Sequence, residues 1–179
     1  MLVPRITLLL ALTAAPALAQ THKPATPTPA RPAPAPAGPK SIGKFDDWTA
    51  ATHQEAGQTV CYAFTRVQSS LPAVPGRGPV ILTVTERPSG RDAVAIESGF
   101  PFAPNAAVTV QVDQTALDFY TDKRNAFARD GKAVVASFHK GSRAIARSPG
   151  PKDAQVTDTY SLKGFSAAYA AIVKACPGK

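Results

Sequence analysis

The side chains with the most specific chemistry in this 179-residue sequence are three histidines and two cysteines. His53 and His139 are too far apart for the short spacing of helical metal ligands, and His22 stands in a proline-rich stretch. The sequence has no G-x-S-x-G elbow for nucleophilic catalysis and no G-x-G-x-x-G loop for phosphate binding. We therefore predict no catalytic residues, no metal and no cofactor, and we keep a small periplasmic hydrolase that uses His53 or His139 as the alternative.

The first 40 residues differ in composition from the rest of the chain. One early charge, Arg5, precedes an apolar stretch at residues 6–12, and Ala17 and Ala19 occupy the positions that signal peptidase reads. We predict a cleaved signal peptide over residues 1–19 and export to the periplasm or the outer envelope. Residues 20–40 contain seven prolines set mainly among alanine and threonine, which predicts a disordered or polyproline II tether.

The charge of the chain changes once this leader is set aside. The full sequence has a formal net charge of +8, from 20 basic and 12 acidic residues. Four of the basic residues and none of the acidic ones precede residue 41, so residues 41–179 have a net charge of +4. Such a charge is ordinary for a soluble domain, and we predict no nucleic-acid partner.

One part of residues 41–179 is denser in basic side chains than the rest. It predicts a candidate basic patch for an envelope or host protein, for an anionic glycan, or for peripheral contact with lipid head groups. An ordinary solvated surface is the alternative interpretation. The residues concerned are Lys123, Arg124, Arg129, Lys132, Lys140, Arg143 and Arg147.

Apolar and polar residues alternate over most of residues 41–179. Val80, Leu82 and Val84 share one face of a predicted strand, and residues 108–112 show the same alternation. Turn signals rich in glycine, proline and aspartate separate such segments. Seven to nine short strands favour a mainly β fold, an antiparallel β-sandwich or barrel-like domain. Further candidate strands are residues 45–52, 59–68, 93–98, 116–121, 143–148 and 155–160.

Two other segments favour helices. Residues 132–140 are rich in alanine and stop at Gly141, which suits one short internal helix, although Val134 and Val135 also suit a strand. Near the C-terminus, apolar residues recur at helical spacing and predict an amphipathic helix packed on the sheet. These residues are Phe165, Ala168, Tyr169, Ile172 and Cys176.

Cys61 and Cys176 are the only cysteines, and the predicted export places them in an oxidising compartment. We predict a disulfide between them, which would link an early strand to the last turn of the terminal helix. Two buried free thiols are the alternative, and the absence of a C-x-x-C pair argues against a redox or metal role. In the chain-entropy model a bridge closing such a long loop stabilises the folded state by roughly 4 to 5 kcal/mol.

Several segments resemble the invasion-associated locus B (IalB) family, exported bacterial proteins named for a member linked to invasion of host cells. The resemblance runs from about Phe45 to Cys176. Its most specific part is Ser-Leu-Lys-Gly-Phe at residues 161–165, which leads into the helix that ends in cysteine. The other similar segments are residues 45–49, 82–88, 97–102 and 140–142. Many members carry a cysteine a few residues after the tryptophan, where this sequence has residues 50–52, Ala-Ala-Thr.

The resemblance implies an envelope protein and not an enzyme, with a role in envelope integrity or host attachment. The residues that carry it suit structural roles. We expect Trp48 to fill the core, Gly164 to allow the strand-to-helix turn and Phe165 to begin the apolar stripe of the helix. Asp158 alternates onto the same strand face as Tyr160, which predicts a partly buried, hydrogen-bonded structural aspartate.

Overall fold

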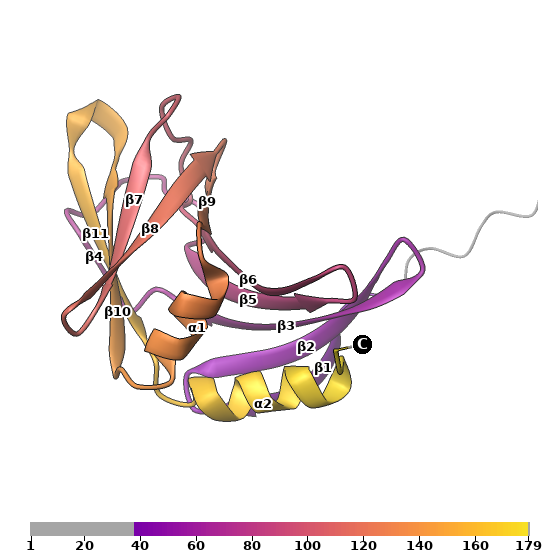
Figure 1. The fold of residues 1–179 in the computed structure, drawn as a ribbon. Coiled ribbons are helices and arrows are strands. Elements are labelled where there is room, and N and C mark those ends of the chain that lie inside the picture. The colour runs from indigo at the N-terminus through magenta and orange to yellow at the C-terminus, as the bar shows by residue number, and fades with distance from the viewer. Residues whose placement is uncertain (1–37, 179) are drawn as a thin grey trace, which may run out of the picture. The chain divides into compact units, whose positions relative to one another are not determined.

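The computed structural model describes residues 38–178 of the chain. The predicted signal peptide, residues 1–19, and residues 20–37 of the predicted tether lie outside the described residues. No helix in the described part is long and apolar enough to cross a membrane. The domain is drawn in Figure 1.

Eleven strands form one sheet in residues 38–178, and every pair of neighbouring strands is antiparallel. The strands are β1 (Lys40–Phe45), β2 (Trp48–Glu55), β3 (Gln58–Arg66), β4 (Ser69–Leu71), β5 (Ile81–Arg87), β6 (Gly90–Glu97), β7 (Ala107–Val112), β8 (Thr115–Asp122), β9 (Asn125–Ala128), β10 (Arg143–Pro149) and β11 (Gln155–Ser161). The helices are α1 (Gly131–Phe138) and α2 (Phe165–Ala175), with a short 3-10 turn at Pro151–Asp153.

The sheet curls but does not close. Its strand order is β1-β2-β3-β5-β6-β9-β8-β7-β10-β11-β4, so β1 and β4 are its two edges. The chain passes from β3 directly into β4, which pairs with β11, and the Gln68 amide donates to the Thr159 carbonyl at 2.8 Å. The expected mainly β, antiparallel fold with a C-terminal helix is confirmed, in the form of one open, strongly curved sheet (Figure 1).

The sequence pattern did not predict three strands, β1, β4 and β9. The strand expected over residues 45–52 is present as β2 but begins only at Trp48, because Asp46 adopts a left-handed φ of 48° and turns the chain between β1 and β2. β1 carries a register shift between Ser41 and Gly43, which breaks its alternation. β4 and β9 have three and four residues, too few to show a period of two.

The short internal helix is confirmed as α1. Its N-cap is Asp130, whose side chain accepts a hydrogen bond from the Ala133 amide at 2.9 Å and so satisfies one free donor of the first turn. Phe138, in the last turn, is buried and its ring meets Phe165 edge-on at 5.3 Å. This contact brings α1 and α2 onto the same face of the sheet.

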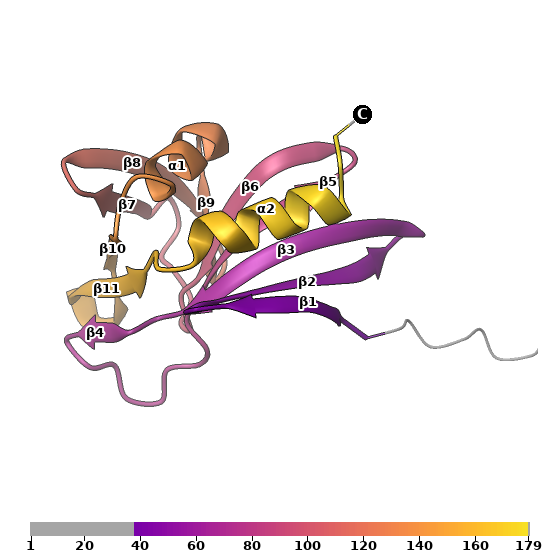
Figure 2. The same ribbon diagram turned by 90° about the horizontal axis from the view of Figure 1, so that it is seen from below.

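Helix α2 lies along β1, β2 and β3, as Figure 2 shows from below. The predicted stripe is confirmed: Phe165, Ala168 and Ile172 are fully buried against the sheet. Trp48 packs edge-on against Phe165 with ring centroids 4.9 Å apart, and its indole N–H donates to the Ser161 carbonyl at 2.9 Å. These contacts fix where β11 ends and the helix begins.

Gly164 makes the turn into α2 possible for two reasons. Its φ is +87°, a left-handed conformation that residues with a side chain rarely adopt. A Cβ atom at this position would also lie 2.0 Å from the carbonyl oxygen of Phe45. The strand-to-helix junction therefore packs closely against the β1–β2 hairpin. The resemblance led us to expect that Gly164 allows this turn.

The other half of the sheet contains a buried ion pair. Asp158 on β11 is 2% exposed and accepts two hydrogen bonds from the Arg77 guanidinium, at 2.6 and 2.8 Å. Ser70 on β4 donates to the same carboxylate at 2.7 Å, and Arg77 Nε donates to the Ser98 carbonyl at 2.6 Å. Asp158 is thus buried and hydrogen-bonded, and its partner Arg77 was not singled out from the sequence.

Tyr160 lies two residues farther along β11 and is fully buried. Burial, followed by the nearby Asp158 carboxylate, raises the pKa of its phenol far above the usual range, so the ring stays neutral. Its hydroxyl has no hydrogen-bond partner among the described residues. Tyr160 therefore contributes apolar volume to the core.

Removing Arg77 should leave the buried Asp158 carboxylate without its counter-ion. We expect Arg77→Met to lower the free energy of unfolding by about 3 to 5 kcal/mol, the usual cost of breaking a buried ion pair from one side. Lys163→Met is the matched control, because Lys163 is 74% exposed and pairs with Asp46 at 3.3 Å on the surface, where such a pair is worth about 0 to 1 kcal/mol. Denaturant unfolding of both variants measures this, and equal losses would contradict a structural role for the buried pair.

Candidate functional site

The sheet face opposite α2 carries an open groove of about 810 Å³ over β2, β3, β5, β6 and β9. The helices and the main apolar core lie on the other face, so the side chains that point into the groove are not part of that core. Strand pairing sets them in rows across the sheet. Phe64 stands beside Thr83, which stands beside Ala95, and Tyr62 stands beside Thr85. A second row runs from Arg66 through Ile81 and Glu97 to Asn125.

Aromatic rings form the floor of the groove at its β3 side. Tyr62 and Phe64 are both half-buried and lie stacked, with ring centroids 6.0 Å apart and planes inclined by 27°. His53 meets Tyr62 edge-on at 5.4 Å. These rings give the groove a continuous apolar surface that remains open to solvent.

Charged groups stand at the ends of the groove. Arg87 pairs with Glu55 at 3.0 Å, whereas Arg66 is exposed and has no acidic partner within the part of the chain that the structure describes. Glu97 lies in the same row as Arg66, two strands away. Of the residues that line the groove, His53 alone was singled out from the sequence, as a candidate residue of the hydrolase alternative. The signal that could have found them is the alternation of β3, which sets Tyr62 and Phe64 on the face opposite Cys61 and Ala63.

The seven predicted basic residues are all exposed, but the fold spreads them over several places. Lys123 and Arg124 precede β9 and Arg129 follows it, so they lie at its two ends, while the others belong to α1, the loop after it and β10. Three make local contacts: Arg124 donates to the Gly99 carbonyl at 2.6 Å, Arg147 donates to Gln111 at 2.8 Å, and Arg129 lies over the Tyr120 ring at 5.6 Å. Binding by the candidate basic patch stays a prediction.

The two histidines of the hydrolase alternative lie on different elements. His53, on β2, is 3.7 Å from the Glu55 carboxylate. His139 follows α1, and its Nδ1 lies 2.8 Å from the Ser166 hydroxyl, with the ring packed on Phe165 and Tyr169. Among the described residues no acid forms a hydrogen bond with His139, and no group of three metal-ligating side chains occurs. The His139–Ser166 contact therefore lacks the acid that orients the histidine of a catalytic triad.

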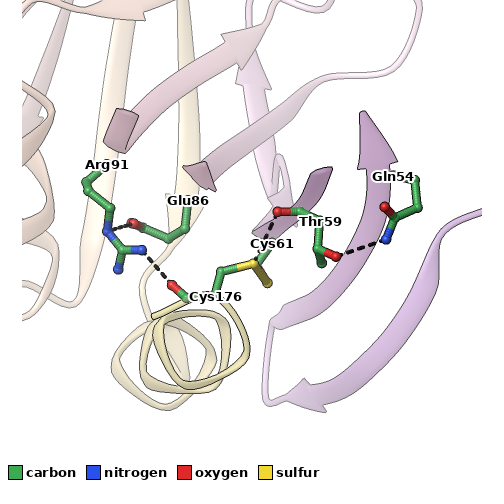
Figure 3. Close-up of a disulfide and its surroundings, with 6 residues drawn as sticks. All are labelled: Gln54, Thr59, Cys61, Glu86, Arg91 and Cys176. Atoms are coloured by element: carbon green, nitrogen blue, oxygen red, sulfur yellow. Dashed lines mark hydrogen bonds and ion pairs between the residues drawn. A yellow bond between two sulfur atoms is a disulfide. The ribbon is translucent and has the colours of Figure 1, made fainter. Parts of the chain in front are cut away.

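The predicted disulfide between Cys61 and Cys176 is present and joins β3 to the residue that caps α2 (Figure 3). The alternative of two free thiols is therefore set aside. The bridge closes a separation of 115 residues, so it constrains the unfolded chain strongly. Together with the Trp48–Phe165 contact, it fastens α2 to the sheet at both ends of the helix.

A charged cluster that the sequence did not reveal lies beside this disulfide (Figure 3). Glu86 stands opposite Cys61 in the β3–β5 register, and its side chain is fully buried. Its Oε2 lies 2.5 Å from Arg91 Nε without the alignment of a hydrogen bond, and Arg91 also donates to the Cys176 carbonyl. Asp92 donates its amide to Glu86 Oε1 and accepts a hydrogen bond from the Tyr169 hydroxyl. The cluster thus connects the β5–β6 hairpin to α2.

Burial dominates the titration of Glu86. It raises the pKa of the carboxyl to about 7, while the Asp92 amide and the Arg91 guanidinium act in the opposite direction. The folded state therefore binds more protons than the unfolded state between about pH 4.5 and pH 7. Because stability falls with rising pH wherever the folded state holds the extra proton, this group destabilises the fold as pH rises through that window.

We predict that Glu86→Gln removes this contribution. The free energy of unfolding of the variant, relative to the native chain, should increase steadily between about pH 4.5 and pH 7 and stay level above that range. Denaturant titrations at several pH values measure the difference. Glu55→Gln, which removes a half-exposed carboxylate from the β2–β3 hairpin, is the control. A pH-independent difference between Glu86→Gln and the native chain would show that Glu86 does not titrate in this window.

The curled antiparallel sheet, with a disulfide-linked terminal helix on one face and an open groove on the other, defines a mainly β protein without a recognisable catalytic triad in its described residues. Residues 48–173 match the family model described as "Invasion associated locus B (IalB) protein", and the chain belongs to this family. The resemblance seen in the sequence is thereby confirmed.

A solved structure has the same fold. The crystal structure of invasion associated protein B from Bartonella henselae matches with a TM-score of 0.56 and 17% sequence identity, over 74% of this chain and 95% of that chain. No curated protein matches the chain. The structural likeness concerns the fold alone, and a shared fold does not identify a ligand.

Proposed function

We propose that this protein is an exported, envelope-associated binding protein without catalytic activity. The observation that carries the proposal is the groove over β2, β3, β5 and β6, where Tyr62 and Phe64 stay half-exposed although the domain has a well-formed core on the other face. An open apolar surface flanked by a few polar and charged groups is typical of a ligand site. Family membership agrees with such a role in envelope integrity or host attachment.

The arrangement of the leader supports export in this proposal. Residues 1–19 have the charged, apolar and small-residue order of a signal peptide, and residues 20–40 have the proline-rich composition of a tether that would hold the domain away from a surface. The disulfide fits an oxidising compartment such as the periplasm or the outside of the cell. Lys40 already belongs to β1, so the tether leads directly into the edge of the sheet.

A hydrolase is the second candidate, because His139 and Ser166 are within hydrogen-bond distance. Both side chains are exposed, and the histidine lacks an orienting acid among its described neighbours. A serine without an activated base is a weak nucleophile. The binding function therefore accounts for more of the structure than the hydrolase does.

Cell fractionation tests the proposal on the full chain in the bacterium that makes it. We expect the protein in the envelope fraction, beginning at Gln20, and its resistance to added protease separates a periplasmic location from a surface location. A protein that remains in the cytoplasm with residues 1–19 attached would contradict the proposal.

A complementation experiment in the same bacterium distinguishes the binding function from the hydrolase function. A deletion strain supplied with the His139→Ala chain should behave like one supplied with the native chain, because His139 lies outside the groove and binding does not need it. Loss of function in that strain, with the variant protein present at the native level, would favour the hydrolase.

A further inference from the structure

We propose that the groove binds an acidic glycan of the bacterial envelope, in which neutral sugars alternate with sugars that carry a carboxylate. Tyr62 and Phe64 would stack on the sugar rings, and Arg66 would pair with a carboxylate. The inference rests on the proposed function, since it names the ligand class of the same groove. It is carried by three properties of the groove: its aromatic floor, its lack of free backbone groups and its unpaired charge.

The aromatic floor suits sugar rings. Tyr62 and Phe64 are two residues apart on β3, so both rings stand on one face of the strand, stacked with their centroids 6.0 Å apart and their planes inclined by 27°. Aromatic faces carry partial negative charge and attract the slightly positive C–H groups that cover one side of a pyranose ring. Because the two rings are stacked on each other, a sugar ring would pack on the exposed outer side of the pair.

Only side chains of the groove are free to form hydrogen bonds with a ligand. β3 is paired on both sides, with β2 and β5, so its backbone donors and acceptors are occupied by the sheet. A peptide that binds by adding a strand needs a free edge, which this face lacks. The side chains of Thr83, Thr85 and Asn125 instead present hydroxyl and amide groups beside the rings, and these match the many hydroxyl and amide groups of an amino sugar.

The charge of the groove selects the ligand further. Arg66 lacks an acidic partner in the part of the chain that is described, and a guanidinium binds a carboxylate through two parallel hydrogen bonds. Glu97, two strands away in the same row, repels a second anion placed close to the first. A glycan with a carboxylate on every other sugar can place one carboxylate at Arg66 and a neutral sugar near Glu97. A uniformly charged polyanion can also pair with Arg66, but it would place a second anion near Glu97.

Titration calorimetry with the full chain tests this proposal. The probe is a tetrasaccharide of alternating N-acetylglucosamine and N-acetylmuramic acid, and the neutral control is the N-acetylglucosamine tetramer. We expect the acidic tetrasaccharide to bind about tenfold or more tightly than the neutral one, and expect added salt to reduce this preference. Preferential binding of a hyaluronan tetrasaccharide would overturn the bacterial source, and preferential binding of a proline-alanine octapeptide would overturn the glycan.

Variants place the binding in the groove. Tyr62→Ala/Phe64→Ala should weaken binding of both tetrasaccharides about tenfold or more, because it removes the stacking surface. Arg66→Gln should reduce the acidic probe to the affinity of the neutral one. Lys174→Gln in the last turn of α2 also removes one positive charge, outside both the groove and the candidate basic patch, and should leave binding unchanged.

Ala95→Trp separates loss of binding from loss of folding, because it fills the groove and keeps the native side chains that form it. Ala95 lies half-buried in the middle of the groove, so a large ring there blocks the groove without removing any native contact. This variant should keep the native unfolding curve and lose binding. The proposal is overturned if neither tetrasaccharide binds, if Ala95→Trp binds normally, or if Lys174→Gln weakens binding as much as Arg66→Gln. A protein that is exported but binds neither probe removes the glycan and leaves the proposed function standing.

Discussion

The fastening of α2 to one face of the sheet is the constraint on which the rest of this structure depends. At its start, Gly164 brings the chain against the β1–β2 hairpin, and Trp48 packs on Phe165. At its end, the disulfide holds Cys176 against Cys61 on β3. An eleven-residue helix pinned at both ends can cover only one face of three strands. The opposite face is consequently left open, and it is there that the groove lies.

At the other end of the sheet, the short edge strand β4 is held in place by side chains. β4 has three residues and pairs with β11 only, so little backbone hydrogen bonding holds the end of the curled sheet. The Arg77–Asp158 pair, with Ser70, connects the loop after β4, strand β4 itself and β11, and the side chains of Arg77 and Asp158 are almost fully buried. A desolvated, multiply bonded ion pair is directional, and it sets how β4 lies on the sheet more closely than apolar packing would.

The sequence could predict those parts of the fold that depend on local pattern. The alternation in residues 80–86 is a local pattern and correctly predicted a strand. The apolar stripe from Phe165 to Cys176 is also local and correctly predicted the terminal helix. β4 and Arg77 could not be found in this way, because three residues show no period and a turn arginine does not reveal its distant carboxylate. The groove depends on register: Phe64 and Thr83 are separated in sequence and meet only when β3 pairs with β5. Pairing of the cysteines was predictable from their number and from the predicted export, whereas the burial of Glu86 beside them was not.

The central claim is that the face opposite α2 is where this protein meets its ligand. Hydroxyl-radical footprinting of the full chain tests it most directly, by comparing the purified protein with the protein in its native cell envelope. Tyr62 and Phe64 should be protected in the envelope, while Tyr120, which is 45% exposed on β8 outside the groove, should be labelled equally in both. Equal labelling of Tyr62 and Phe64 in the two samples, with protection found elsewhere on the domain, would contradict the claim.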